Sequence, residues 1–359
     1  MRTIRIPVKK AVPGMIAAED IYNTSNQLVI SKGTKLSDKV ITRLKFHLIS
    51  DLFIIIEDKK PEVPEKTNAS FSEITKESVE FKHFNKAFVE SVHDFKGELN
   101  KIMDKDAPID TSGLLQHATS ILSESRNGMH VFEMLHCMRE YDDLTYVHSL
   151  NVALICNVFG KWLKLSESDI EILTLSGMLH DIGKQMLPAS IINKQGVLTI
   201  AEYSTIKTHT IQGYNILKDQ DIDQRVKYAT LMHHERCDGS GYPNKLHGPE
   251  IESFAKIIAI VDVYDAMTSA RVYRPALSPF SAISIFESEG LQKYDPHYIM
   301  TFLQEIVQSY VGNRVRLSNN LEGEIRLINK NSLSKPVVQC GSNFIDLSKE
   351  SNISIVKIL

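Results

Sequence analysis

The stretch HHERCDGSGYP, residues 233–243, decides how the rest of this sequence is interpreted. Two adjacent histidines end what the pattern predicts as a helix, and a glycine-rich turn follows that closes on Tyr242 and Pro243. Neighbouring residues of an α-helix point about 100° apart, so one apolar face cannot bury both imidazoles. Either one imidazole lies on the surface without a functional role, or a group between helices binds both of them.

The predicted helices on either side of this stretch carry further residues of the kind that bind metal ions. Two of these helices end in such residues, and a helix C-terminus carries partial negative charge that favours a cation. A single His-Asp pair is more often a chance surface dipeptide. Five histidines and two aspartates over five consecutive helices are together strong evidence for a shared site. These residues are His148, His180, Asp181, His209, His233, His234 and Asp262.

Two neighbours of these residues have structural interpretations. Asp262 lies in an apolar run, where a buried carboxylate needs a partner. Asp265, one turn later, is expected to be a structural hydrogen-bond acceptor rather than a ligand. Gly183 directly follows the helix that ends at His180 and Asp181, and it suits the cap of that helix.

The number of candidate ligands indicates more than one metal ion. Five imidazoles and two carboxylates exceed the four ligands of a tetrahedral zinc ion. The set suits two octahedral-leaning ions that share a bridging carboxylate, and the absence of cysteine ligands favours iron or manganese. Two metal ions about 4 Å apart generate a bridging hydroxide and hold both oxygens of an in-line displacement at phosphorus. The sequence therefore predicts metal-assisted phosphoester hydrolysis.

Four stretches together resemble the HD-GYP domain, a branch of the HD phosphohydrolase superfamily. They are HDIGK (180–184), HTIQG (209–213), HHERCDGSGYP and VDVYDAMTSARVYR (261–274), within a resemblance that covers about residues 140–305. The pattern HHE-x-x-D-G-x-G-Y-P is matched at every fixed position. The resemblance implies an all-helical, metal-dependent phosphodiesterase that hydrolyses the bacterial messenger cyclic di-GMP to pGpG or GMP. Some members of the family prefer cyclic GMP-AMP.

The resemblance also implies roles for individual residues. It makes the seven histidines and aspartates above the metal ligands, with Asp181 bridging two ions. Lys184 would hold a phosphate oxygen at the attacked phosphorus, and Tyr242 would contact the substrate. Arg271 and Arg274 match phosphate-contacting positions, for which planar guanidinium groups are suited, although a solvated basic stretch is the alternative. Some members have a glutamate for a third metal where this chain has Leu144, so two ions are expected.

The remaining sequence predicts a multi-domain, mainly α protein with small β-containing domains at both ends. Alternating apolar residues near the start and a short helix over 37–48 indicate an α+β domain, and a polar segment with two prolines follows it. After Tyr310 the apolar period changes to two, which predicts a barrel-like β domain. The expected parts are the N-terminal α+β domain (1–58), a linker (59–70), a helical segment (71–139), the catalytic domain (140–309) and the C-terminal β domain (310–359).

One helix has an apolar seam with nearly heptad spacing. The seam comprises Phe81, Phe84, Phe88, Val92, Phe95, Leu99 and Ile102. Such a seam is typical of a helix that packs on its own domain. A homodimer-forming or signal-transmitting helix over 81–102 is the second interpretation.

Composition sets broader limits on the protein. An apolar fraction of 43% and a charged fraction of 24% are ordinary for a soluble protein, and no apolar run is long enough to cross a membrane. Four scattered cysteines and the lack of a signal peptide favour a cytoplasmic protein. A net charge of −3 predicts no affinity for nucleic-acid polymers.

These observations leave three functional hypotheses. The leading one is a phosphodiesterase with cyclic di-GMP as its substrate. A phosphohydrolase of cyclic GMP-AMP or another nucleotide is the second. A non-catalytic receptor for cyclic dinucleotides is the third, although a receptor has no need of seven metal ligands. The sequence leaves open which metal is bound, whether pGpG or GMP is the product, and what signal the terminal domains receive.

Overall fold

The chain forms two compact units, Met1–Asn68 and Ala69–Leu359. The computed structural model describes residues 2–8, 11–23, 28–37, 40–41, 43–44, 47, 49, 51–56, 75–103, 108–138, 144–194, 196–269 and 276–359. The linker that the sequence predicts over 59–70 lies outside these ranges. The five-part division therefore stays a prediction.

The N-terminal unit is built on short antiparallel strands. Its strands are β1 (Arg2–Pro7), β2 (Ile16–Ala17), β3 (Ile21–Tyr22), β4 (Leu28–Ile30) and β5 (Asp51–Ile56). β5 lies between β1 and β2 in one sheet, while β3 and β4 pair separately. Leu52 and Ile54 alternate with more exposed neighbours on β5 and reach a small core of their own. The helix predicted over 37–48 falls largely outside the described residues.

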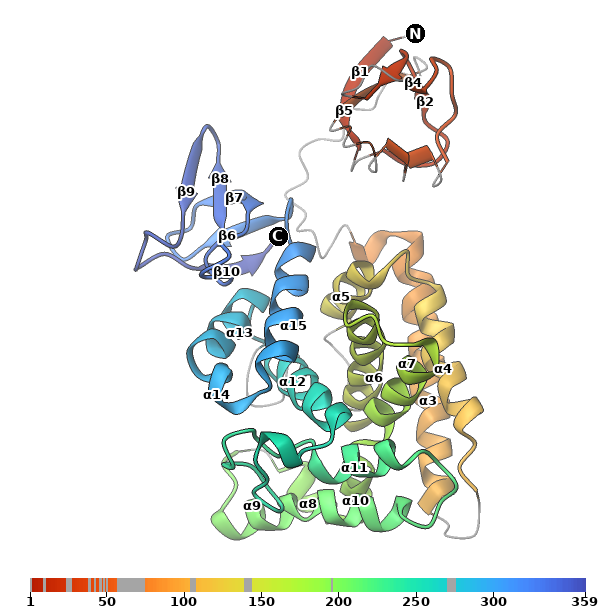
Figure 1. Cartoon of the computed structure of the whole chain (residues 1–359), viewed down its shortest axis with the longest axis vertical. Coiled ribbons are helices and arrows are strands. Elements are labelled where there is room, and N and C mark those ends of the chain that lie inside the picture. Colours follow the sequence, from red (N-terminus) through yellow and green to blue (C-terminus); the bar gives the residue numbers. More distant parts are fainter. Residues whose placement is uncertain are drawn as a thin grey trace. The chain divides into compact units, whose positions relative to one another are not determined.

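The second unit is mainly helical, as the sequence predicts (Figure 1). Ser166, Thr199 and Asp295 cap three of these helices, because each side chain accepts a hydrogen bond from a backbone amide in the first turn of its helix. The helices are α3 (Val79–Met103), α4 (Thr111–Ser123), α5 (Gly128–Cys137), α6 (Leu144–Trp162), α7 (Glu167–Leu179), η2 (Ile182–Met186), α8 (Ala189–Ile192), α9 (Ile200–Lys207), α10 (His209–Leu217), α11 (Gln224–Met232), η3 (Gly248–Glu250), α12 (Ser253–Thr268), α13 (Pro279–Ile285), η4 (Phe286–Gly290), α14 (Leu291–Lys293) and α15 (Pro296–Ser309).

The apolar seam of α3 is buried within its own unit. α3 packs against α4 and α6, and six of the seven seam residues are buried while Val92 is partly buried. Phe95 meets Tyr146 of α6 edge to face, with ring centroids 6.4 Å apart. The helix therefore packs on its own domain, and a dimer through this seam is not shown.

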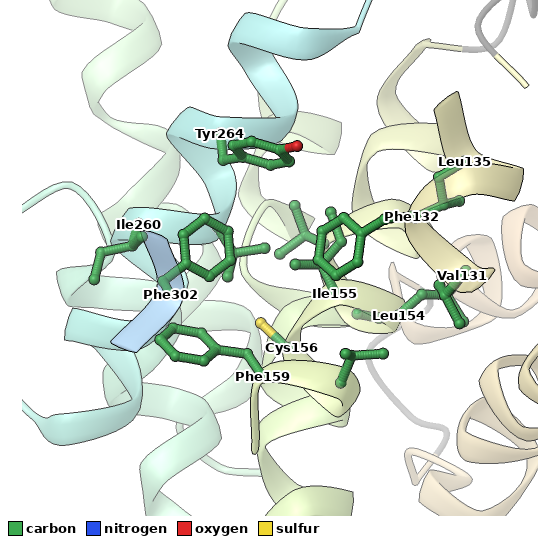
Figure 2. Packing of buried hydrophobic residues seen from close by; sticks show 14 of the residues in the cluster. Val131, Phe132, Leu135, Leu154, Ile155, Cys156, Phe159, Ile260, Tyr264 and Phe302 are labelled. Carbon is green, nitrogen blue, oxygen red and sulfur yellow. The ribbon is translucent and has the colours of Figure 1, made fainter. Parts of the chain in front are cut away.

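A cluster of aromatic rings fixes the central helices of the second unit. Figure 2 shows residues of α5, α6, α12 and α15 converging on one core. The Phe302 ring lies 4.9 Å from that of Phe159 and 5.3 Å from that of Tyr264, measured between centroids. Such contacts hold α6 and α12 side by side. These two helices carry His148 and Asp262.

The C-terminal strands form a single sheet in which the two edge strands do not pair with each other. The strands are β6 (Arg314–Leu317), β7 (Glu322–Leu327), β8 (Val337–Cys340), β9 (Asn343–Asp346) and β10 (Ile355–Ile358). Their order is β10-β6-β7-β8-β9, antiparallel throughout, so β10 and β9 are edges. The predicted closure is thus not shown. Val315 and Ile355 belong to the same core as the helices, and the Ser278 hydroxyl donates to the carbonyl of Ile355 over 3.2 Å.

Two simpler expectations concern membranes and disulfides. Among the described residues, no helix combines the length and the apolar character that crossing a bilayer requires. No disulfide joins the four cysteines, all of which lie in the described ranges.

Candidate metal centre

The structure brings all seven predicted metal ligands together from six neighbouring elements. His148 comes from α6, His180 follows the last residue of α7, Asp181 precedes η2, His209 begins α10, His233 and His234 follow α11, and Asp262 lies in α12. They form two groups, in each of which the potential ligand atoms lie within 4.8 Å of one another. One group is Asp181, His209, His233 and His234, and the other is His148, His180 and Asp262.

Asp181 belongs to the first group but also faces the histidines of the second, with one carboxylate oxygen directed to each set of histidines. Its Oδ1 is 3.3 Å from Nε2 of His209 and 3.8 Å from Nε2 of His233. Its Oδ2 is 3.4 Å from Nε2 of His180 and 3.7 Å from Nε2 of His148. This is the arrangement that a carboxylate shared by two metal ions requires.

Backbone carbonyls orient three of the histidine rings. Nδ1 of His180 donates to the carbonyl of Gly177 over 2.7 Å, and Nδ1 of His209 donates to that of Ile206 over 2.6 Å. His233 does the same one turn back along α11. Because a carbonyl only accepts, each Nδ1 carries the hydrogen, and in the neutral ring Nε2 then keeps its lone pair. The lone pairs therefore face the centre, as metal binding demands.

A carboxylate orients the fourth ring. Nδ1 of His148 lies 2.7 Å from Oδ2 of Asp265. The other oxygen of Asp265 accepts from Asn151 and from the hydroxyl of Ser269, each over 3.0 Å. Asp265 is thus a buried structural acceptor, which confirms the sequence interpretation.

Removing this acceptor should weaken metal binding without removing a ligand. We expect Asp265→Ala to lower the affinity of the His148 group for Mn²⁺ about 10- to 100-fold, because the imidazole loses its orientation and part of its basicity. Titration of metal-free protein with Mn²⁺ measures this. Asp265→Asn, which keeps one acceptor oxygen, should lose less. Unchanged affinity in Asp265→Ala would contradict the role.

The donor atoms fit divalent metal ions. Among the described residues, Nε2 of His180 and Oδ1 of Asp181 are buried atoms without a hydrogen-bond partner. Burying such atoms without a partner is costly, and a bound cation removes that cost. Imidazole nitrogens and carboxylate oxygens without thiolates suit iron or manganese. The centre thus presents unsatisfied ligand atoms where a metal ion would lie.

The protonation states of most of these side chains also favour metal binding. Burial alone would raise the pKa of Asp181, but Lys184, His180 and His209 outweigh it and hold the pKa well below its usual range. Burial lowers the pKa of His234 to about 3, and it lowers the pKa of His233 strongly as well. An ionised carboxylate and neutral imidazoles are the states that bind metal.

The predicted substrate-contacting residues lie partly within the described structure. The Lys184 ammonium contacts Oδ2 of Asp181 at the centre. The Tyr242 ring stacks on that of His234 with centroids 4.7 Å apart, and burial raises the pKa of its hydroxyl, which stays neutral. Arg271 and Arg274 lie outside the described residues.

A buried glutamate that the sequence interpretation did not single out holds the turn that carries Tyr242. The Glu235 carboxylate accepts from the amides of Asn244 over 2.6 Å and Leu246 over 3.0 Å. Gly241 passes so close that a Cβ there would lie 2.4 Å from Cα of Glu235. The fixed glutamate and glycine of the HHE-x-x-D-G-x-G-Y-P pattern are the signal that could have indicated both roles.

Gly183 does not cap α7, contrary to the sequence interpretation. It lies inside η2, where a Cβ would meet the carbonyl oxygen of His209 at 1.9 Å. The glycine is therefore needed for the close approach of η2 to α10. This contact sets Asp181 and His209 beside each other.

α9 adds two residues at the edge of the centre that no sequence pattern indicated. The Lys207 ammonium lies 4.7 Å from the ring centroid of Tyr203 and 5.5 Å from that of Tyr242. The contact with Tyr242 depends on how α9 meets the turn after α11, whereas Tyr203 lies four residues before Lys207 on the same helix. The contact with Tyr242 leaves no trace in local spacing.

Comparisons with known proteins agree with this centre. Residues 130–298 match the family model of the HD domain. A cyclic di-GMP phosphodiesterase of Pseudomonas aeruginosa is 32% identical over 230 residues, covering 64% of this chain and 53% of that protein. A cyclic di-GMP phosphodiesterase of Thermotoga maritima is 35% identical over 177 residues, or 48% of each chain. A 3'3'-cGAMP-specific phosphodiesterase of Vibrio cholerae is 39% identical over 145 residues, 40% of this chain and 34% of that protein.

The chain spans about half the length, or less, of the curated relatives that it matches. The matched residues contain the whole candidate centre, from His148 to Asp262. Residues 130–298 of this chain therefore match the HD domain family, in agreement with the motifs found in the sequence.

Proposed function

We propose that this protein is a metal-dependent phosphodiesterase that hydrolyses cyclic di-GMP to pGpG, GMP or both. The observation that carries the proposal is Asp181, which directs one oxygen to each of two groups of potential metal ligands. The names of the relatives support the substrate class.

In this proposal the two groups hold two divalent ions, iron or manganese, and Asp181 is the ligand that they share. Bound ions of this kind acidify water and neutralise charge at phosphorus in a displacement. The protein contributes the fixed positions of the donors: six elements packed on one core set the seven side chains before any substrate arrives. Preformed donors need little reorganisation during the reaction.

The residues around the ions would bind and orient the substrate. Lys184 places a positive charge beside Asp181, where the attacked phosphate would lie. Tyr242 offers a neutral hydroxyl that can donate a hydrogen bond to a phosphate oxygen. Arg271 and Arg274 would hold phosphate oxygens through their planar guanidinium groups.

One comparison favours a second substrate. The Vibrio cholerae relative is named as specific for 3'3'-cGAMP, and its identity over the matched residues is 39%. Cyclic GMP-AMP differs from cyclic di-GMP only in one base, while the phosphodiester chemistry is the same. Cyclic GMP-AMP is therefore the second candidate for this centre.

The proposal is tested by purifying the protein without oxygen, counting its metals and following cyclic di-GMP hydrolysis by chromatography. We expect about two iron or manganese ions per chain and a product of pGpG or GMP. Chelation should stop hydrolysis, and Mn²⁺ or Fe²⁺ should restore it. Metal-loaded protein that cleaves neither cyclic di-GMP nor cyclic GMP-AMP would contradict the proposal.

A further inference from the structure

Lys207 stands out among the lysines near the centre because its ammonium has no anionic partner among the described residues. Lys184 contacts Asp181, and Lys194 lies 2.6 Å from a carboxylate oxygen of Glu202. Lys207 is half-buried at the end of α9, and the described residues place no carboxylate within ion-pair distance of it. A half-buried cation of this kind is a position that an anion can fill.

Two aromatic rings fix the direction of this ammonium. The rings of Tyr203 and Tyr242 lie 4.7 Å and 5.5 Å from Nζ of Lys207, within the range of attraction between a cation and an aromatic face. Tyr203 remains 47% exposed, so it leaves surface for an incoming ligand. The long lysine side chain is thereby held in one orientation before a ligand binds, which lowers the entropy lost on binding.

The position of Lys207 is at the edge of the metal centre rather than inside it. The Tyr242 ring separates the ammonium from the ligands, because it also stacks on His234 at 4.7 Å and lies 6.5 Å from the ring of His209. A protonated amine cannot bind a metal ion. Lys207 is therefore suited to an anionic group of the substrate that lies beside the reacting phosphate.

We propose that Lys207, held by Tyr203 and Tyr242, binds the phosphate of the cyclic dinucleotide that is not being cleaved. The inference rests on the proposed function. A cyclic dinucleotide carries two phosphodiesters, and Lys184 is already placed at the one that the metal centre would attack. Lys207 supplies the charge for the second. It takes no part in bond making or breaking, so its contribution is to substrate binding and selectivity.

The test compares two substrates that differ in their number of phosphates. Lys207→Met keeps the length and the apolar stem but removes the charge. Selectivity for cyclic di-GMP over bis(p-nitrophenyl) phosphate, which has one phosphodiester, should fall about tenfold as a ratio of kcat/KM values. The change should come from the KM for cyclic di-GMP. Lys207→Arg should retain most of the selectivity, and Lys218→Met, at an exposed position, should retain all of it.

A binding measurement separates positioning from turnover. Equilibrium dialysis of metal-loaded protein with a slowly hydrolysed phosphorothioate analogue of cyclic di-GMP should show a dissociation constant about tenfold higher for Lys207→Met, or 1.4 kcal/mol. Tyr203→Phe, which keeps the aromatic face, should bind like the wild type, whereas Tyr203→Leu should bind more weakly.

Each remaining outcome counts against a defined claim. Wild-type protein that cleaves cyclic di-GMP, with selectivity and binding unaltered in Lys207→Met, overturns the role of Lys207 alone. Equal losses on both substrates also overturn it, because they place Lys207 in the support of the metal centre. Wild-type protein that neither binds nor cleaves a cyclic dinucleotide overturns the proposed function, and this inference falls with it.

Discussion

Replacing Asp181 with asparagine is expected to lower kcat/KM for cyclic di-GMP about a thousandfold or more and to release both metal ions together. Each carboxylate oxygen faces a different group of histidines, so the substitution removes a ligand from both groups at once. Asparagine keeps the shape but loses the charge that would offset the two proposed cations. Several kcal/mol of transition-state stabilisation are lost with the metals, which corresponds to this change in rate. Metal content and steady-state kinetics measure the two effects.

Two further variants serve as comparisons for this prediction, and one outcome would contradict it. Asp219→Asn makes the same chemical change at an exposed turn and should leave metal content and activity as in the wild type. His148→Ala removes one ligand from one group only, so it should spare more of the metal bound by the other group. Asp181→Asn protein that keeps two ions per chain would show that Asp181 is not shared.

The identities of the candidate ligands could be predicted because they stand in local motifs. His180 and His233 end helices, and the positions of helix ends follow from caps and apolar spacing within a few residues. Ser166 and Thr199 are examples of such caps, since each is a hydroxyl residue at the start of its helix with an acidic residue three positions later. Local chemistry thus indicated which side chains belong to the centre before their arrangement was known.

The arrangement itself depends on contacts that are distant in sequence. Asp265 orients His148 across a separation of 117 residues, and no spacing rule links the two. The division of the ligands into two groups follows from how six elements pack around Asp181. For the same reason the sequence could predict the strands after Tyr310 but not whether their sheet closes. Closure depends on the pairing of the edge strands, β9 and β10.

Gly183 shows how a single backbone contact can control this arrangement. A Cβ at this position would lie 1.9 Å from the carbonyl oxygen of His209 and 2.5 Å from the amide nitrogen of Gly213. Both atoms belong to the backbone of α10, so no flexible side chain can move aside. Gly183→Ala must therefore push η2 away from α10. We expect the free energy of unfolding to fall by about 3 kcal/mol, as for severe overpacking in a core.

The same substitution should reach the metal centre, because Asp181 lies two residues before Gly183 and His209 begins the displaced helix. Metal content should fall in Gly183→Ala protein even under conditions where it remains folded by circular dichroism. Gly97→Ala in α3 is the matched control: a Cβ there meets nothing within 4 Å, so this variant should gain about 0.5–1 kcal/mol of stability and keep its metals. Full metal binding in Gly183→Ala would mean that η2 and α10 can separate without moving Asp181 from His209. The close approach would then serve stability alone, and the geometry of the centre would depend on the packing of α6, α7 and α12.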